Sequence, residues 1–306
     1  MNEIRVFSPA TVANVVCGFD CLGFCLEEPN DEMLLRKIDE KTVRIINKDN
    51  FGLPTQPENN VAGIVLLEML KAVDADFGFE VEITKNIKPG SGIGSSSASA
   101  VGAAFAANQL LNRRFTKLQV TEFAMFGEQL ASQGRHADNI APCQFGGFTL
   151  VRSVSPLDIA ELKFPTLFVT IIHPQIEIKT SDARKMLPQN VPLKDAIKQW
   201  ANVGGLVSGL ASGDYKLISR SLEDFIIEPV RKSLIPKYDE VIELSQVCGS
   251  LGGGISGSGP SMFFLSETLE IATNLEIAIT KLYQSTNLEF NTFVNKISDK
   301  GVRIAE

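Results

Sequence analysis

The chain has 306 residues, enough for one large domain or two ordinary ones that each bury a core without disulfides or metals. Its composition, 44% hydrophobic and 21% charged, is typical of a globular protein and excludes extensive disorder. Lys and Arg number 29 against 36 Asp and Glu, and the net charge of -7 argues against nucleic acid as a partner, because phosphates attract basic surfaces.

The first half of the chain predicts short strands and helices around one irregular, glycine-rich segment. Alternating apolar residues predict strands, whereas apolar residues at helical spacing and runs rich in Ala predict helices. The predicted strands are 4–7, 42–47, 78–84 and 146–152, and the predicted helices are 60–73, 95–111 and 117–131. Segment 86–94 contains too much Gly to be regular, which gives the order strand, glycine loop, helix.

The second half alternates strands with helices after a stretch of weak patterning at 154–163. The predicted strands are 167–172, 253–256, 262–265 and 289–294, and the predicted helices are 181–186, 193–211, 215–225, 237–247 and 269–283. We place a domain boundary in the weak stretch, which gives domains 1–155 and 156–306. The alternation in the second domain indicates an α+β sandwich.

The N-terminus lacks a basic region followed by an apolar run, and no apolar stretch reaches membrane-spanning length. We therefore expect a cytoplasmic protein without a membrane partner. The five cysteines form no C-x-x-C pair, and no histidine lies near Cys17, Cys21 and Cys25 in the sequence. Free thiols are expected rather than a metal cluster.

The glycine loop is the segment that points most directly to chemistry. Gly90, Gly92 and Gly94 permit positive φ, so the backbone can direct several N–H groups at one anion. A helix that begins near Ser95 adds unpaired N–H groups and the positive end of its dipole. This pattern predicts a cradle for the phosphates of ATP, although a flexible turn capped by serine is the alternative. The predicted nucleotide-binding residues are Lys88, Pro89, Gly90, Ser91, Gly92, Ile93, Gly94, Ser95, Ser96, Ser97 and Ala98.

Other phosphate-binding signatures do not account for the sequence. There is no G-x-x-x-x-G-K-[ST] and no H-R-D catalytic loop. A G-x-G-x-x-G occurs at Gly252, Gly254 and Gly257, but the segment after it reads as a strand, whereas a dinucleotide site needs a helix there. We interpret that match as chance.

Two further blocks accompany the glycine loop. Residues 9–20 offer Asn14 and Asp20, and residues 255–261 form a second glycine turn. In this order the three blocks resemble the signature of the GHMP kinases, small-molecule kinases named for galactose, homoserine, mevalonate and phosphomevalonate. The resemblance implies a two-domain α+β fold, with an N-terminal domain of the ribosomal S5 domain 2-like type, a C-terminal ferredoxin-like sandwich and the active site between them.

Shorter blocks are similar to the homoserine kinase branch of this family. They are 134–142, 146–147, 173–174, 180–188 and 228–231. This similarity implies transfer of a phosphoryl group from ATP, with Mg²⁺, to the side-chain hydroxyl of L-homoserine in threonine biosynthesis. The sequence leaves the oligomeric state open, with a homodimer as one alternative.

The resemblance also implies roles for single residues. Loop 89–97 would hold the phosphates, Ser96 and Glu128 would ligate magnesium, and Thr180 would lie near the γ-phosphate. An oxygen-only shell of this kind is what Mg²⁺ prefers. For the adenine pocket, Asn60 and Val61 are the candidates. The residues implied to bind the amino acid are Asn14, Asp20, Asn139, Arg184 and Arg231. Arginine suits the carboxylate of such a substrate, and Asp20 suits its ammonium group.

The implied mechanism depends on Asn139. Mevalonate kinases resembling this chain carry an aspartate there as the proposed base, and asparagine cannot accept the proton. Asp138 should point elsewhere if the segment is extended, because successive side chains alternate. We therefore expect Asn139, Glu128 and Thr180 to carry the chemistry without a strong protein base, while His136 remains an alternative acid or base.

Two other functions remain open. One is a sibling kinase acting on mevalonate, a sugar or a diphosphocytidyl alcohol, although Arg184 and Arg231 favour a substrate with a carboxylate. The other is a non-catalytic sensor of ATP or a metabolite built on the same scaffold. The sequence departs from the family pattern at Ile93 and at Val15-Val16-Cys17, but neither change removes a charged or ligating group.

Overall fold

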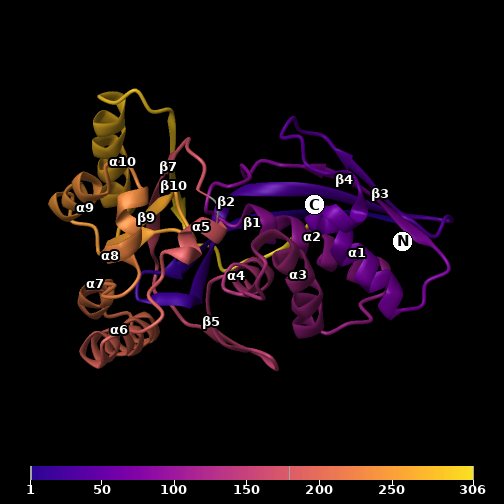
Figure 1. The fold of residues 1–306 in the computed structure, drawn as a ribbon, viewed down its shortest axis with the longest axis horizontal. Helices are drawn as coiled ribbons and strands as arrows, with labels where there is room; N and C mark the ends of the chain where they lie inside the picture. The colour runs from indigo at the N-terminus through magenta and orange to yellow at the C-terminus, as the bar shows by residue number, and fades with distance from the viewer. Residues whose placement is uncertain (1, 179, 306) are drawn as a thin grey trace.

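The computed structural model describes residues 2–178 and 180–305, without the side chains of Thr180 and Ser181. In this part of the chain, two β-sheets lie at opposite ends of an elongated molecule and each carries its own helices (Figure 1). The expected α+β architecture with two sheet-and-helix units is therefore confirmed.

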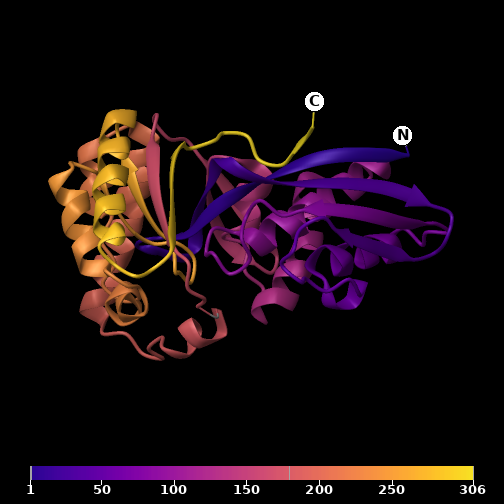
Figure 2. The ribbon, with the colours of Figure 1, turned by 90° about the horizontal axis from the view of Figure 1, so that it is seen from above.

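The first sheet is built around two long antiparallel strands, β1 and β2. Its strands are β1 (Glu3–Val15), β2 (Gly18–Ile38), β3 (Val43–Asn47), β4 (Gly78–Thr84), β5 (Phe148–Val154), β6 (Leu157–Leu162) and β11 (Arg303–Ile304). The order is β11-β1-β2-β4-β3, and β5 pairs with another part of β2 and with β6. Figure 2 shows the two termini close together over this sheet, where β11 pairs with β1.

Four helices cover one face of the first sheet (Figure 1). They are α1 (Val61–Ala72), α2 (Ser95–Leu110), α3 (Lys117–Ser132) and α4 (Ile140–Phe145), and a 3₁₀ turn (Pro57–Asn59) precedes α1. Helix α2 is buried on nearly every side, because its Ala, Ser and Gly side chains let the sheet and α1 and α3 approach closely. The sheet and the surrounding helices thus fix the position of the α2 N-terminus.

The second sheet has the antiparallel order β10-β7-β9-β8. Its strands are β7 (Phe168–Pro174), β8 (Gly252–Ile255), β9 (Met262–Ser266) and β10 (Phe290–Lys296). The longer helices are α6 (Leu193–Ser212), α7 (Tyr215–Ser221), α9 (Tyr238–Val247) and α10 (Leu269–Gln284), and the short ones are α5 (Thr180–Lys185), α8 (Glu228–Arg231) and the 3₁₀ turn Lys232–Leu234. With β7 first and α10 before β10, this is the βαββαβ pattern of a ferredoxin-like sandwich.

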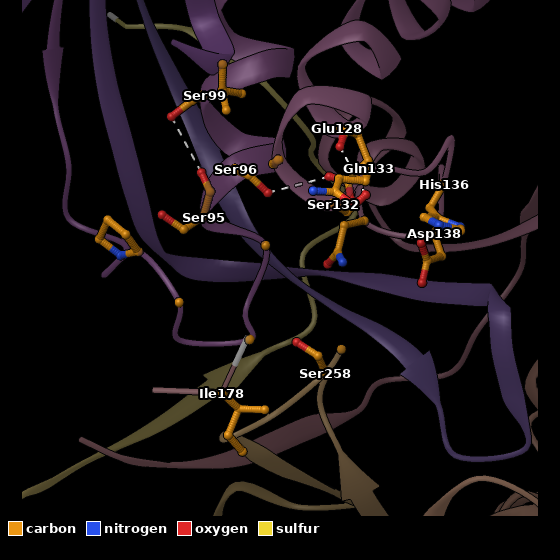
Figure 3. A pocket seen from close by; sticks show the side chains of 18 of the residues that line it. Ser95, Ser96, Ser99, Glu128, Ser132, Gln133, His136, Asp138, Ile178 and Ser258 are labelled. Carbon is orange, nitrogen blue, oxygen red and sulfur yellow. Dashed lines mark hydrogen bonds between the residues drawn. The ribbon is translucent and has the colours of Figure 1, made fainter. Parts of the chain in front are cut away.

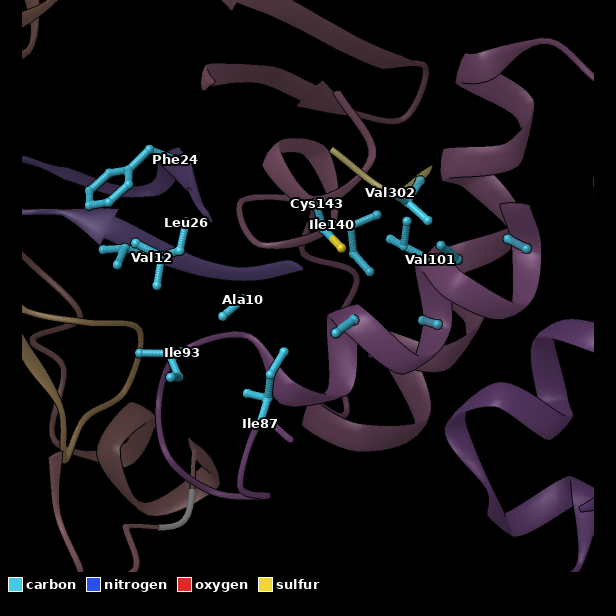
Figure 4. Close-up of a cluster of buried hydrophobic side chains, with 14 of the residues drawn as sticks. Ala10, Val12, Phe24, Leu26, Ile87, Ile93, Val101, Ile140, Cys143 and Val302 are labelled. Atoms are coloured by element: carbon cyan, nitrogen blue, oxygen red, sulfur yellow. The ribbon is translucent and has the colours of Figure 1, made fainter. Parts of the chain in front are cut away.

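Strand β9 separates two hydrophobic cores. Its side chains alternate, so Phe263 packs in the cluster of the first sheet while Phe264 packs under α9 and α10. The ring of Phe263 lies 5.4 Å from that of Phe24 on β2. Figure 4 shows Phe24 and Val12 in the shared core, with Ile93 of the glycine loop beside them. This core joins the two sheets and holds the loop between them.

Most of the predicted elements agree with the structure to within two residues, but the first strands do not. The predicted strand 4–7 is only part of β1, and the 21-residue β2 was not predicted. From Ser8 to Ala13 every residue of β1 is buried, so the alternation that indicates a strand is absent there. The predicted helix 215–225 ends at Ser221.

The change of sheet does not coincide with the predicted boundary. Strand β6 pairs with β5 in the first sheet, so the chain passes to the second sheet after Leu162, and β11 returns to the first. The division into 1–155 and 156–306 stays a prediction.

All five cysteines are free thiols, as expected. Among the described helices, none has both the length and the apolar character of a membrane span.

Candidate active site

A cavity of about 470 Å³ lies where the motif blocks meet. The β1–β2 turn, by which we mean residues 14–20 and so include the adjoining strand ends, contributes Asn14 and Asp20. The end of α3 contributes Glu128. Arg184 of α5 and Arg231 of α8 reach it from the second half of the chain. Figure 3 shows the serines at the start of α2 facing Glu128, with His136 and Asp138 further along the pocket. The cavity therefore gathers the groups expected for a nucleotide and an amino acid.

The glycine loop enters this cavity with the predicted backbone conformation. Gly90, Gly92 and Gly94 have φ values of 75°, 81° and 73°, which favour glycine strongly. A Cβ at Gly94 would collide with the hydroxyl of Thr11. Gly94 also precedes α2 and offers no side chain to cap it. The first N–H groups of α2 are therefore available to an anion, since a helix cannot pair them internally.

The second glycine turn fastens the loop through two serine hydroxyls. Ser256 Oγ donates to the carbonyl of Gly92 at 2.7 Å, and Ser261 Oγ donates to that of Ser91 at 2.6 Å. Both carbonyls are thus held by the second glycine turn. These bonds fix the loop in place, so that it need not reorganise when an anion arrives.

The β1–β2 turn is fastened to the same glycine turn. Asn14 Nδ2 donates to the carbonyl of Gly257 at 2.8 Å, and Gly257 N donates to that of Ala13 at 3.0 Å. Asn14 Oδ1 also accepts from the backbone N–H of Asp20 at 2.8 Å. Asn14 and Asp20 both have φ of 57°, a conformation that non-glycine residues adopt rarely and that clusters at functional sites. The three motif blocks therefore form one hydrogen-bonded unit.

A buried ion pair supports the loop from the first sheet. Lys85 Nζ bonds to Asp31, to the carbonyl of Ser95 at 2.7 Å and to Ser99 Oγ at 3.0 Å. The side chains of Lys85 and Asp31 are only 1% and 2% exposed. The second oxygen of Asp31 accepts from the backbone N–H groups that follow Lys85. Every polar atom of the pair is satisfied, which is the condition under which buried charges are tolerated.

Ser96 and Glu128 form an oxygen pair at the start of α2. Ser96 Oγ lies 3.5 Å from Glu128 Oε2. Burial raises the pKa of the Glu128 carboxyl, while Ser132, Ser96 and the charge of Arg184 oppose that shift. Among the described residues, no cluster of three or more His, Cys, Asp or Glu could hold a metal. Any cation bound here would take its other ligands from phosphate and water.

Asp20 and Arg184 are already paired. Arg184 donates to both carboxylate oxygens of Asp20, at 2.7 and 3.1 Å. His136 Nδ1 lies 3.4 Å from Arg184 Nη2 and 3.9 Å from Asp20 Oδ1. Burial, more than the nearby Arg184, lowers the pKa of His136, so its ring is neutral at physiological pH. A ligand with both a carboxylate and an ammonium group can engage both members of the pair.

Arg231 is more deeply placed than Arg184. It is 3% exposed, and its Nε donates to the carbonyl of Ala183 at 3.2 Å. The guanidinium groups of Arg231 and Arg184 lie 5.0 and 5.6 Å from the ring of Phe19. Burial and the charge of Arg184 lower the pKa of Arg231. Two cations held together on one aromatic ring, in a partly closed cavity, form a strong site for a carboxylate.

The expectation that the segment at Asp138 and Asn139 is extended is wrong. Asn139 has φ of -94° and ψ of -38° and begins α4, so the segment is not extended and its side chains do not alternate. Both residues line the cavity. Burial and the charges of Asp20 and Glu128 raise the pKa of Asp138 to about 7. Figure 3 shows Asp138 beside His136, away from Ser96.

Asn139 is oriented by the first motif block. Its Oδ1 accepts from Thr11 Oγ1 at 2.8 Å, so its amide nitrogen remains the donor for a ligand. Thr11 itself donates its backbone N–H to the carbonyl of Ile93, in the glycine loop. Asn139 is therefore held against the loop on which the phosphates are expected.

The predicted loop residues divide into two groups. Those that line the cavity are Pro89, Gly90, Gly92, Gly94, Ser95 and Ser96. Lys88 is exposed outside it, and Ser91, Ile93, Ser97 and Ala98 are buried beside it. Their part in nucleotide binding stays a prediction. The side chain of Thr180 lies outside the described residues, and its place near the γ-phosphate also stays a prediction.

Several cavity residues were not predicted. Those near the start of α1 are Leu53, Pro54 and Asn59, and others are Ile83, Lys85, Ala131, Ser132, Gln133, Glu177, Ile178, Gly257 and Ser258. The suggested Asn60 and Val61 do line the cavity. Asn60 caps α1 and also donates to the carbonyl of Pro54 at 2.7 Å, which holds that segment beside the cavity. The second glycine turn, 255–261, offered a signal in the sequence for Gly257 and Ser258, although neither was assigned to the site.

Comparison with known families covers both halves of the chain. Residues 60–147 match the GHMP kinases N terminal domain, and residues 206–284 match the GHMP kinases C terminal domain. The chain is 41% identical to a homoserine kinase of Chlorobium phaeobacteroides, over 99% of this chain and all of that protein. It is 35% identical to a homoserine kinase of Pyrococcus furiosus, over 96% and 98% of the two chains.

Solved structures agree with these relatives. The crystal structure of homoserine kinase from Cytophaga hutchinsonii superposes with a TM-score of 0.96 at 46% identity, and covers all of this chain and 98% of that one. An L. major mevalonate kinase in complex with R-mevalonate shares the fold, with a TM-score of 0.72 at 15% identity over 94% of each chain.

Breaking the buried ion pair should destabilise the fold. We expect Lys85→Met to lower the free energy of unfolding by about 3–5 kcal/mol, because Asp31 is then left as an unpaired buried charge. Urea denaturation measures the change. The matched control is Lys88→Met, which alters an exposed lysine of the same segment and should change stability by less than about 0.5 kcal/mol. Equal effects of the two variants would contradict the support assigned to Lys85.

The raised pKa of Asp138 predicts a pH-dependent stability difference. Below the ordinary pKa of 3.8 both states are protonated, and as pH rises toward 7 the unfolded state loses its proton first, so the wild type loses stability. Relative to the wild type, Asp138→Asn should therefore gain up to about 4 kcal/mol between pH 4 and 8. Urea denaturation across this range tests it, with the exposed Glu223→Gln as the control. A pH-independent difference would contradict the raised pKa.

Proposed function

This chain belongs to the GHMP kinase family, and we propose that it transfers the γ-phosphoryl group of ATP to the side-chain hydroxyl of L-homoserine, in threonine biosynthesis. The products are ADP and O-phospho-L-homoserine. The observation that carries the substrate is full-length similarity to proteins named homoserine kinase, with 46% identity at a TM-score of 0.96 for one of them. The two arginines in the cavity suit the carboxylate of that substrate.

The loop and the start of α2 suit the triphosphate of ATP. The backbone N–H groups and the helix dipole favour phosphate oxygens, and a side chain at Gly94 would leave no room for its neighbour Thr11. The adenine would lie toward Pro54, Asn60 and Val61, which also line the cavity. The γ-phosphate is then directed toward Asn139.

The opposite end of the cavity suits an amino acid. Arg184 and Arg231 would bind the carboxylate, and Asp20 would pair with the ammonium group. Because Asp20 and Arg184 are already joined, the substrate enters a site whose charges are balanced and positioned, which lowers the cost of ordering them. Asn14 helps to orient Asp20, because its Oδ1 accepts from the backbone N–H of Asp20.

Ser96 and Glu128 suit Mg²⁺. Two oxygens 3.5 Å apart can both reach one small cation, and magnesium accepts a few protein oxygens with phosphate and water as its remaining ligands. When bound, the ion would neutralise phosphate charge. The raised pKa of Glu128 fits a carboxylate that lacks a partner cation.

Phosphoryl transfer is proposed to proceed without a strong protein base. The substrate oxygen bonds to the γ-phosphorus as the bond to the β-phosphate oxygen breaks, and the hydroxyl proton passes to a phosphate oxygen. Asn139 orients the hydroxyl with its free amide nitrogen, and α2 stabilises the charge of a loose transition state. Asp138 lies on the His136 side of the pocket and shapes the amino-acid end instead.

Two other functions have less support. A mevalonate-type substrate shares the need for a carboxylate site, but the mevalonate kinase structure is only 15% identical and supports the fold alone. A non-catalytic sensor would not require the orientation of Asn139 or the Ser96–Glu128 pair.

A cytoplasmic location agrees with five free thiols, and the homodimer stays a prediction.

A coupled assay of ADP release tests the proposed function. The wild type is given ATP, Mg²⁺ and one acceptor at a time from L-homoserine, L-serine, L-threonine, mevalonate and galactose. We expect the highest kcat/KM with L-homoserine. Preference for another alcohol would overturn the substrate but keep the kinase, and absence of turnover with every acceptor would support the sensor.

Changing either member of the Ser96–Glu128 pair should weaken the response to magnesium. We expect Glu128→Gln and Ser96→Ala to raise the Mg²⁺ concentration for half-maximal rate and to lower kcat at least about tenfold. Magnesium titrations at fixed ATP measure both effects. Glu122→Gln, an exposed change on the same helix, should leave the titration unaltered. An unchanged magnesium response in Glu128→Gln would overturn this ligand assignment.

Loss of the Asp138 carboxylate should affect the rate only modestly. We expect Asp138→Asn to lower kcat less than about tenfold, because the residue does not accept the hydroxyl proton. Steady-state rates with saturating ATP and amino acid give the value. A fall of about a thousandfold, at the upper end of what a general base contributes, would identify Asp138 as the base and overturn the proposed mechanism.

A further inference from the structure

Arg231 is carried by a helix too short to hold its own position. Helix α8 spans only Glu228–Arg231, and Ile227 before it provides no side-chain cap. One turn of helix closes few internal hydrogen bonds and is unstable alone. A bidentate grip on a carboxylate nevertheless requires the guanidinium to be placed within about half an ångström. Contacts outside α8 must therefore set the position of Arg231.

Asp224 supplies three of these contacts. Its Oδ1 accepts from the backbone N–H groups of Ile226 at 2.8 Å and Ile227 at 3.0 Å, and its Oδ2 accepts from that of Glu228 at 3.0 Å. The carboxylate thus binds three successive N–H groups that lead into α8. Asp224 is only 9% exposed, and hydrogen bonds to an ionised acceptor are about twice as strong as neutral ones.

Gln199 connects this cap to the β1–β2 turn. From α6, its Nε2 donates to Asp224 Oδ1 at 3.0 Å and to the carbonyl of Cys17 at 3.1 Å, and its Oε1 accepts from the N–H of Phe225 at 2.9 Å. Cys17 lies two residues before Phe19, the ring beside which Arg231 rests. The same amide therefore fixes the helix that carries the arginine relative to the turn that carries the ring.

We propose that Asp224 and Gln199 are positioning residues that set the orientation of Arg231 and hence the affinity for the substrate carboxylate. Neither side chain lines the cavity, so both act through Arg231. The inference rests on the proposed function only in taking the acceptor to be an alcohol that carries a carboxylate.

A second attachment of α8 allows the cap to be altered without losing the fold. Glu228 Oε1 accepts from the N–H of Ile255 at 2.7 Å, and Oε2 accepts from the hydroxyl of Tyr238 at 2.8 Å. These bonds hold α8 on β8 and α9 when Asp224 is changed. Replacement of Asp224 should therefore change the orientation of the Arg231 guanidinium more than it lowers the stability of the domain.

The first experiment separates binding of the two substrates. Asp224→Asn keeps the shape of the side chain but removes its charge and one acceptor. We expect KM for L-homoserine to rise about 10- to 100-fold, KM for ATP to change less than about threefold and kcat to fall less than KM rises. Glu223→Gln removes the same charge from the exposed neighbour and should leave all three constants unchanged. A uniform loss in kcat with unchanged KM would overturn the inference.

A double-mutant cycle tests whether Asp224 acts through Arg231. In an Arg231→Lys background the bidentate grip is gone, so adding Asp224→Asn should raise KM for the amino acid less than about threefold. Effects that multiply independently would overturn the inference. Gln199→Leu should behave like a weaker Asp224→Asn. Asn202→Ala, which removes another α6 amide bonded to this segment through the Glu223 carbonyl, serves as its control.

A readout without turnover separates this inference from the proposed function. Hydrogen exchange should become faster at the amides of Ile226, Ile227 and Glu228 in Asp224→Asn, and stay unchanged in Glu223→Gln. If the wild type prefers another carboxylate-bearing alcohol, the proposed substrate fails, and the cycle is measured with that acceptor. Unchanged exchange in Asp224→Asn overturns the positioning role whatever the substrate is.

Discussion

The attachment of the glycine loop to both sheets is the constraint on which the rest of the site depends. A segment with glycine at three alternate positions loses much conformational entropy when it is ordered, about 1–2 kcal/mol per residue for the backbone alone. The Asp31–Lys85 pair holds it from the first sheet, and the hydroxyls of Ser256 and Ser261 hold it from the second. The N–H groups at the start of α2 are therefore fixed before phosphate binds, which is how such a site stabilises developing charge.

The same attachment explains why the amino-acid site lies next to the loop. The second glycine turn bonds both the loop and the β1–β2 turn, so Asn14 and Asp20 are placed relative to the phosphates by a single element. Arg184 then joins Asp20 directly, while Arg231 reaches the cavity from α8. In the proposed complex, separate groups that share one rigid support would meet the charge of the substrate and that of the phosphates, which favours positioning as the main source of catalysis.

Local chemistry explains what could be predicted from the sequence. The strand, loop and helix around Gly90, Gly92 and Gly94 were predictable because glycine conformation and the start of a helix depend on neighbouring residues. Contacts between distant segments were not. Lys85 reads as an ordinary lysine until Asp31 is placed beside it, and the segment at Asp138 was expected to be extended because a turn into α4 cannot be told from a strand there. The long β2 was missed because its burial changes along the strand as different elements cover it.

The most direct test of the central claim compares kcat/KM for L-homoserine with that for 3-aminopropan-1-ol, which keeps the hydroxyl and the amine but lacks the carboxylate. If Arg184 and Arg231 bind that carboxylate next to the fixed loop, kcat/KM should fall at least about a thousandfold, because the buried Arg231 is left without an anion and Arg184 keeps only Asp20. Nearly equal values for the two alcohols would contradict a site built around the carboxylate, and with it the proposed substrate.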